Sequence, residues 1–208
     1  MKVKTKILPR LMVAVIIVNI AVVMLSWLVT AIMPDCGLRS LLSAEGVRWT
    51  VGYFADHQQT PLLIWMLLLA IAFGTLSKSG LYDVLKQLLL RRVSRHELRY
   101  RQRFALQMAV LMFVLLVAVV VLMTCVSQAA LMSITGSLAN GVFPKSIVPL
   151  VAFAVSLVSV VYGYFSGTLS SLDAVFQSLH YGIRVAAPYL LLYVMTASLV
   201  SSLFFVFG

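Results

Sequence analysis

Five long apolar runs alternate with shorter polar segments along this chain. The runs cover residues 8–33, 61–77, 104–126, 147–166 and 187–207. An α-helix rises about 1.5 Å per residue, so about 20 apolar residues cross a hydrocarbon core of about 30 Å. The second run is short for this distance, and we expect Lys78 at its end to reach the headgroups. The pattern predicts an all-α, polytopic integral membrane protein with about five transmembrane helices, in a single membrane domain over residues 1–208.

Three of the connecting segments have helical periodicity and one apolar face. In residues 38–54, Trp49 is suited to the headgroup level, which predicts a short interfacial helix. Residues 81–89 are expected to form a second amphipathic helix, on the inner membrane surface. Residues 168–186 are expected to form a third, separate from the last span, which Pro188 is expected to open. The pattern leaves open whether this third segment is interfacial or re-entrant.

The first run follows a basic segment, as in a secretory signal peptide. Its apolar part is longer than the roughly 7–15 residues of a signal-peptide core and ends without a small-x-small cleavage pattern. We therefore expect an uncleaved spanning helix.

Composition excludes an ordinary soluble domain. Of the 208 residues, 62% are hydrophobic and 11% are charged, whereas about a quarter of a soluble domain is charged. The net charge of +10 would suggest nucleic acid if it lay on a soluble surface, but the basic residues gather at the ends of apolar runs. Topology and anionic headgroups explain that placement. We expect the lipid bilayer as the environment and no nucleic-acid partner.

The basic residues also predict an orientation. Half of the 16 Lys and Arg residues lie in a basic hinge over residues 78–103. The topology-setting residues are Arg91, Arg92, Arg95, Arg99, Arg101 and Arg103. Positive residues beside a span resist translocation and stay in the cytoplasm. The first span also follows a basic segment, whereas only Arg39, Arg48 and Lys145 fall in the connections on the other side of the membrane. The N-terminus and the hinge are therefore expected on the cytoplasmic side.

Chemistry-bearing residues are sparse. The apolar cores of the five runs contain no Asp, Glu, Lys, Arg or His. The histidines, His57, His96 and His180, lie on separate segments and predict no shared ligand or general-base site. The cysteines, Cys36 and Cys125, are too few for a metal site by spacing, and the sequence does not tell whether they are bonded. We expect no enzyme, catalytic residue, metal or cofactor.

Small residues recur along the fourth span. Ser156, Ser159, Gly163 and Gly167 stand at three- and four-residue steps and form one stripe. Such a stripe lets membrane helices approach closely. It is therefore a candidate for helix packing, either with another protein or, as an equal alternative, within the chain. Pro149 is expected in the first turn of this span, where its missing donor costs little.

Two blocks of the sequence resemble the p-aminobenzoyl-glutamate transporter (AbgT) family of bacterial inner-membrane proteins. The first is LLSAEGVRWTVGYF with TPLLIWMLLLAIAFGTLSKSGL, and the second runs from GSLANGVFPKSIVPL to SSLFFVF. The second contains a Y-G-x-x-x-G-T pattern at Tyr162, Gly163, Gly167 and Thr168. The resemblance implies a bacterial inner-membrane location and an elevator-type carrier, in which two re-entrant hairpins hold the substrate near the mid-membrane.

Neither hairpin region of the resembled family is recognisable here. The first, with a Ser-Asp-Ala-Gly signature, should follow the SGL block, where this sequence enters the basic hinge. The second should follow the last span. The resemblance therefore implies a reduced, scaffold-like form and transfers no substrate-binding residue. We expect a structural or accessory membrane subunit that dimerises or binds a larger membrane complex. The alternative is a small secondary transporter of the AbgT type that acts as an oligomer.

The orientation yields a direct test. A reporter active only in the periplasm is expected to be active when fused after Gly208 and silent when inserted near Arg95, because basic residues hold the hinge inside. Reporter activity would be measured in cells at matched expression. An active Arg95 insertion with a silent Gly208 fusion would contradict the five-span scheme.

Overall fold

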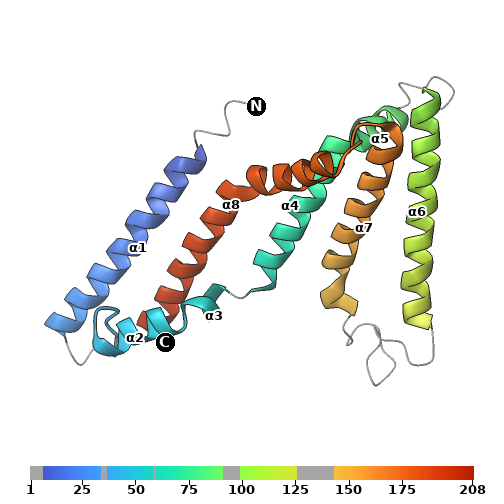
Figure 1. Cartoon of the computed structure of the whole chain (residues 1–208). Coiled ribbons are helices and arrows are strands. Elements are labelled where there is room, and N and C mark those ends of the chain that lie inside the picture. Colours follow the sequence, from blue (N-terminus) through green and yellow to red (C-terminus); the bar gives the residue numbers. More distant parts are fainter. Residues whose placement is uncertain (1–6, 34–36, 59, 91–98, 126–142) are drawn as a thin grey trace. The chain divides into compact units, whose positions relative to one another are not determined.

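The computed structural model describes residues 7–33, 37–58, 60–90, 99–125 and 143–208, and within them every regular element is a helix. The elements are α1 (Ile7–Ile32), α2 (Ala44–Gly52), α3 (Phe54–Gln58), α4 (Pro61–Ser79), α5 (Leu81–Leu89), α6 (Tyr100–Cys125), α7 (Phe143–Ser166) and α8 (Leu172–Phe207) (Figure 1). In this described part, α1, α4, α6, α7 and α8 are long and apolar enough to cross a membrane. The predicted all-helical class with five spanning helices is confirmed.

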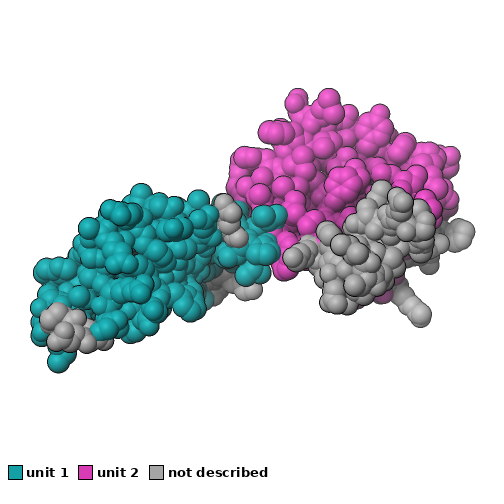
Figure 2. Space-filling model, turned by 90° about the horizontal axis from the view of Figure 1, so that it is seen from below, with its two compact units in different colours: residues 1–64, 187–208 teal, residues 65–186 magenta. Residues whose placement is uncertain are grey.

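The chain divides into two compact units, which Figure 2 colours separately. One comprises Met1–Ile64 and Ala187–Gly208, and the other comprises Trp65–Ala186. The division falls inside α4 and α8, so each of these helices contributes residues to both units. A single membrane domain stays a prediction.

In the first unit, the segment after α1 is tied to both α1 and the end of α8. Leu41, Phe205 and Val206 form a buried cluster. The Arg39 amide donates to the Val206 carbonyl oxygen at 3.2 Å, and the Leu41 amide donates to Ser26 Oγ at 3.3 Å. These bonds satisfy backbone donors that a segment outside a regular helix would otherwise leave open.

A helix predicted from residues 38–54 is present as α2. Ser43 precedes it in an extended conformation, and Ser43 Oγ accepts a hydrogen bond from the Gly46 amide at 3.0 Å. Glu45 in the first turn complements the helix dipole. The Trp49 ring lies 4.6 Å from the Phe205 ring, measured between centroids. The aromatic side of α2 therefore packs on the end of α8, and its place at a membrane surface stays a prediction.

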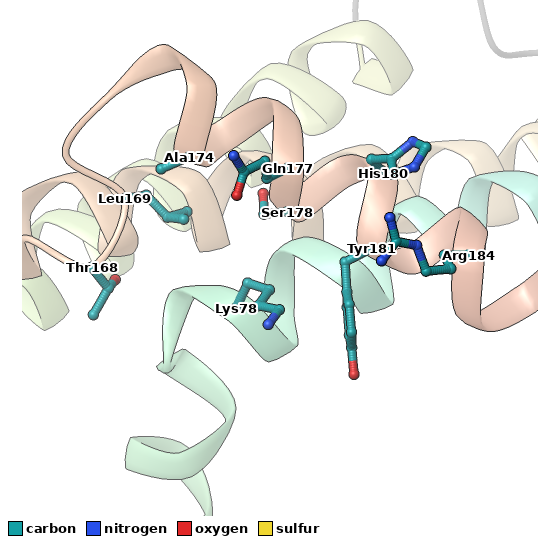
Figure 3. A pocket seen from close by; sticks show the side chains of 9 residues that line it. All are labelled: Lys78, Thr168, Leu169, Ala174, Gln177, Ser178, His180, Tyr181 and Arg184. Carbon is teal, nitrogen blue, oxygen red and sulfur yellow. The ribbon is translucent and has the colours of Figure 1, made fainter.

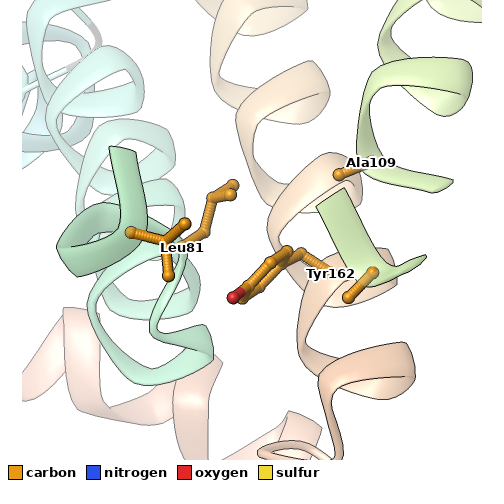
Figure 4. Packing of buried hydrophobic residues seen from close by; sticks show 5 residues of the cluster. Leu81, Ala109 and Tyr162 are labelled. Carbon is orange, nitrogen blue, oxygen red and sulfur yellow. The ribbon is translucent and has the colours of Figure 1, made fainter. Parts of the chain in front are cut away.

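The core of the second unit surrounds Tyr162 of α7. Its side chain is buried with Leu81 and Val84 of α5 and with Ala105 and Ala109 of α6 (Figure 4). The two alanines leave room for the ring, and α6 and α7 run side by side in opposite directions (Figure 1). In lipid such packing stabilises through close contact, because hydrocarbon tails are as apolar as the side chains they replace.

Small residues bring the backbones of α4 and α8 into contact within this unit. A Cβ added at Gly74 would overlap the Ser178 carbonyl oxygen, and one added at Gly182 would overlap the Ala70 carbonyl oxygen. All four residues are buried. We call this contact the glycine crossing.

The structure corrects the expected separation of the segment 168–186 from the last span. From Leu172–Phe207, α8 is one helix with Pro188 inside it, and Ser171 Oγ accepts a hydrogen bond from the Ala174 amide near its start at 3.2 Å. Proline removes a single backbone donor, and its fixed φ is compatible with a helix. Flanking turns of a long membrane helix tolerate that loss, so Pro188 does not open a new element.

The expected place of Pro149 was wrong. Because α7 begins at Phe143, Pro144 occupies its first turn and Pro149 lies in its interior. Proline is tolerated inside membrane helices, where neighbouring groups satisfy the freed carbonyl. α6 also begins earlier than the predicted third span, so Arg101 and Arg103 lie in its first turn.

The glycine crossing predicts a stability effect. Gly74→Ala and Gly182→Ala are each expected to destabilise the protein in detergent by about 1–3 kcal/mol, because the added methyl group must push α4 and α8 apart. The readout is thermal unfolding followed by tryptophan fluorescence. Gly52→Ala is the matched control, because a Cβ at that helical glycine meets nothing within 4 Å. Equal stability of all three variants would contradict the crossing.

Candidate functional site

The turn after α7 is built by two glycines and a threonine. Gly167 has φ 84°, a left-handed conformation that favours glycine and ends the helix. The Leu169 amide donates to the Gly163 carbonyl oxygen at 3.0 Å, and a Cβ at Gly163 would lie 2.5 Å from Leu169 Cδ1. Thr168 Oγ1 donates to the Ser79 carbonyl oxygen at 2.8 Å. The turn motif therefore terminates α7, packs against it and ties it to the end of α4.

A cavity of about 510 Å³ lies beside this turn. Its lining residues are Lys78, Thr168, Leu169, Ala174, Gln177, Ser178, His180, Tyr181 and Arg184 (Figure 3). Lys78 comes from the last turn of α4, and Gln177 to Arg184 come from the first half of α8. The lining contains two permanent cations and no carboxylate, and we call it the basic cavity.

Tyr181 holds one of these cations. The Lys78 Nζ atom lies 4.4 Å from the centre of the Tyr181 ring, a cation–π distance, and Figure 3 shows the two side chains approaching from different helices. Arg184 stands one turn further along α8 and is exposed. Within the described part of the chain, no carboxylate pairs with Lys78 or Arg184. Both charges therefore remain available to an anion.

The predicted packing stripe of α7 makes its described contacts inside the chain. Ser159 is fully buried, and its Oγ has no hydrogen-bond partner among the described residues. Ser156 Oγ donates to the Ala152 carbonyl oxygen of its own helix at 2.8 Å. Gly163 and Gly167 belong to the turn described above. Binding of this stripe to another protein stays a proposal.

Part of the sequence-predicted set lies outside the described residues. Those positions are Arg91, Arg92, Arg95, His96 and Cys36. Arg99 precedes α6, and the Arg101 guanidinium lies beside Gly167. His57 lies against Trp49 with ring centroids 4.2 Å apart and the ring planes tilted by 40°, whereas His180 lines the basic cavity. Among the described residues, no three His, Cys, Asp or Glu side chains gather as metal ligands would.

Asn19 is a functional candidate that the apolar pattern passed over. It lies at the middle of α1 and is half-buried. No hydrogen bond joins its side chain to any residue that the structure describes. The signal was present in the sequence, since one amide stands in an otherwise apolar run. Gly182 was also missed, because it lies in the amphipathic segment rather than in a predicted span.

The model of the AbgT putative transporter family matches residues 80–206. This chain belongs to the AbgT family. The match covers the second block that resembled the family up to Val206, and it also runs through most of the basic hinge and through the third span. No curated protein and no solved structure matches the chain. The AbgT-family chain is thus a multi-pass membrane protein of a transporter family, and its environment is the lipid bilayer.

Proposed function

We propose that this AbgT-family protein is a structural or accessory subunit of the bacterial inner membrane that dimerises or joins a larger membrane complex. Its N-terminus and basic hinge face the cytoplasm in this proposal. The observation that carries it is Asn19, a polar side chain at the centre of a spanning helix with no hydrogen-bond partner in the described part of the chain.

The chemistry of an amide in hydrocarbon favours association. The Asn19 side chain has two N–H donors and one carbonyl acceptor, and no water is present at mid-membrane to satisfy them. A second copy of α1 presents the same amide at the same depth. Because the amide is both donor and acceptor, two copies can bond reciprocally about a two-fold axis. A polar group of another subunit at that depth would serve equally.

The distribution of charge favours a structural role over a coupled carrier. Across the five long helices the only carboxylate is Asp173, which is exposed in the first turn of α8. Proton- and ion-coupled transport commonly uses ionisable residues that face the interior of the helix bundle. Asp173 lies at a helix end instead, so these helices offer packing surfaces more readily than a coupling site.

Association is expected to weaken when the amide is removed. Asn19→Leu should lower the association constant roughly three- to thirtyfold, because an interhelical hydrogen bond in a membrane contributes about 0.6–2 kcal/mol. Leucine favours insertion, so the variant should still reach the membrane. Native mass spectrometry of the full chain in mild detergent would measure the assembled fraction.

Two variants complete this test. Asn19→Gln keeps the amide and should retain assembly, and Val18→Leu is a packing control at an exposed neighbour in α1. Wild-type protein recovered only as a lone monomer would remove the support for a structural subunit. Assembly of Asn19→Leu equal to that of the wild type would show that Asn19 is not its cause.

A groove in the first unit favours the alternative, a small transporter that acts as an oligomer. The groove has a volume of about 460 Å³. Its lining residues are His57, Thr60, Leu62, Tyr193, Thr196, Ala197, Val200, Ser201 and Phe204. The hydroxyl groups of Thr60 and Tyr193 are hydrogen-bonded to each other, and Thr196 Oγ1 donates to the Leu192 carbonyl oxygen at 2.9 Å. Hydroxyl groups beside the spanning part of α8 are suited to orienting a polar substrate.

Transport by the purified chain separates the two roles. Under the structural proposal, liposomes containing only this protein take up no labelled p-aminobenzoyl-glutamate, the substrate after which the family is named. Saturable uptake above that of empty liposomes would support the transporter instead. Thr196→Val, which keeps the side-chain shape and removes the hydroxyl, should then reduce uptake, whereas Thr50→Val outside the groove should not.

A further inference from the structure

We propose that the basic cavity binds the phosphate headgroup of an anionic phospholipid. This inference does not depend on which role under the proposed function is correct. It follows from the depth of the cavity in the membrane, from the charge of its lining and from its size.

The depth follows from α4. Its 19 residues extend about 28 Å at 1.5 Å per residue, which is close to the thickness of the hydrocarbon core. Lys78 lies in the last turn of this helix, so its apolar stem runs along the edge of the core and its ammonium group reaches the headgroups. The cavity that Lys78 lines is therefore at the level of lipid phosphates.

The first half of α8 carries polar side chains at the same level. Gln177, His180 and Arg184 stand at three- and four-residue steps and share one side of the helix. Each of them lines the basic cavity. The residues after Arg184 are apolar for the rest of α8, apart from small hydroxyl residues and tyrosines. The polar side of α8 thus ends where the cavity ends, as expected at the boundary between headgroups and hydrocarbon.

The lining offers hydrogen-bond donors and positive charge, and it contains no carboxylate. Ser178 Oγ already donates to the Val175 carbonyl oxygen at 2.6 Å, and Thr168 Oγ1 donates to Ser79. The side chains of Lys78, Gln177 and Arg184 form no hydrogen bond with described residues. A guanidinium group and an ammonium group without carboxylate partners match the oxygens of a phosphate diester.

The size and composition of the cavity fit a lipid headgroup. A volume of about 510 Å³ exceeds that of a phosphate alone and leaves room for a glycerol unit. Leu169 and Ala174 add an apolar surface to the lining, against which the start of an acyl chain can lie. Basic pockets between membrane helices are a recurring means of binding anionic lipids.

Lipid retention by the full chain tests the proposal. In neutral detergent, native mass spectrometry would titrate phosphatidylglycerol, phosphatidylcholine and inorganic phosphate separately. We expect phosphatidylglycerol to bind at least about tenfold more tightly than phosphatidylcholine. Lys78→Gln and Arg184→Gln should each weaken this binding about tenfold, because a charge-assisted hydrogen bond is lost. Lys78→Arg and Arg184→Lys keep the charge and should retain most of the affinity.

Lys86→Gln and Arg48→Gln are the matched controls, because they remove one positive charge outside the basic cavity. Equal weakening by these controls would show that only net charge matters and would overturn the site. Equal binding of the two lipids would also overturn it. Binding of inorganic phosphate alone as tight as that of phosphatidylglycerol would overturn the lipid assignment. If Lys78→Gln fails to fold, Arg184→Gln decides, since Arg184 is exposed and makes no described polar contact.

Discussion

Satisfying the polar backbone inside hydrocarbon is the constraint on which this structure depends. Each N–H and C=O group within the membrane must bond within the protein, and nearly always inside its own helix, because lipid offers no partner. Hydrophobic burial then cannot hold one helix against the next, and close contact must replace it. Gly74 and Gly182 provide that contact, because a side chain larger than hydrogen at either position would separate α4 from α8. The alanines of α6 play the same part around Tyr162.

Helix ends are where the remaining polar groups gather. In the turn after α7, Thr168 Oγ1 donates a hydrogen bond to the Ser79 carbonyl oxygen. Because α4 ends at Ser79, no later turn of that helix supplies a donor to this oxygen. That bond holds the end of α4 beside the start of α8 and so positions Lys78 near Tyr181. The basic cavity is therefore a consequence of how two helices end. The same turn that completes the fold of the second unit also fixes the end of α4 that carries Lys78, the cation that we propose lies at the headgroup level.

The sequence predicted the number of spanning helices because each needs an apolar run of a length set by the bilayer. Helix boundaries were less predictable: Pro149 and Pro188 were expected at helix starts, yet both lie inside helices. In soluble proteins proline is a strong signal for a helix boundary. In membrane helices it is a weaker signal, because the flanking turns continue the helix. Gly182 was missed for another reason. A glycine predicts a close helix contact only when the residue that it faces is known, and Ala70, which Gly182 faces, lies far from it in sequence.

Polar side chains at different depths point to different partners. At mid-membrane, where we propose that Asn19 lies, only other protein groups can form a hydrogen bond with an amide, because acyl chains have no donors or acceptors. The lack of a described hydrogen bond at Asn19 therefore favours a protein partner. At the headgroup level, where we propose that Lys78 and Arg184 lie, a cation without a carboxylate partner meets lipid phosphate and water, so the same lack favours a lipid. The depth of a side chain in the membrane therefore distinguishes a protein partner from a lipid, whereas its solvent exposure alone does not. Membership of a transporter family leaves both open, because a carrier and its structural subunit need stable association and lipid contact alike.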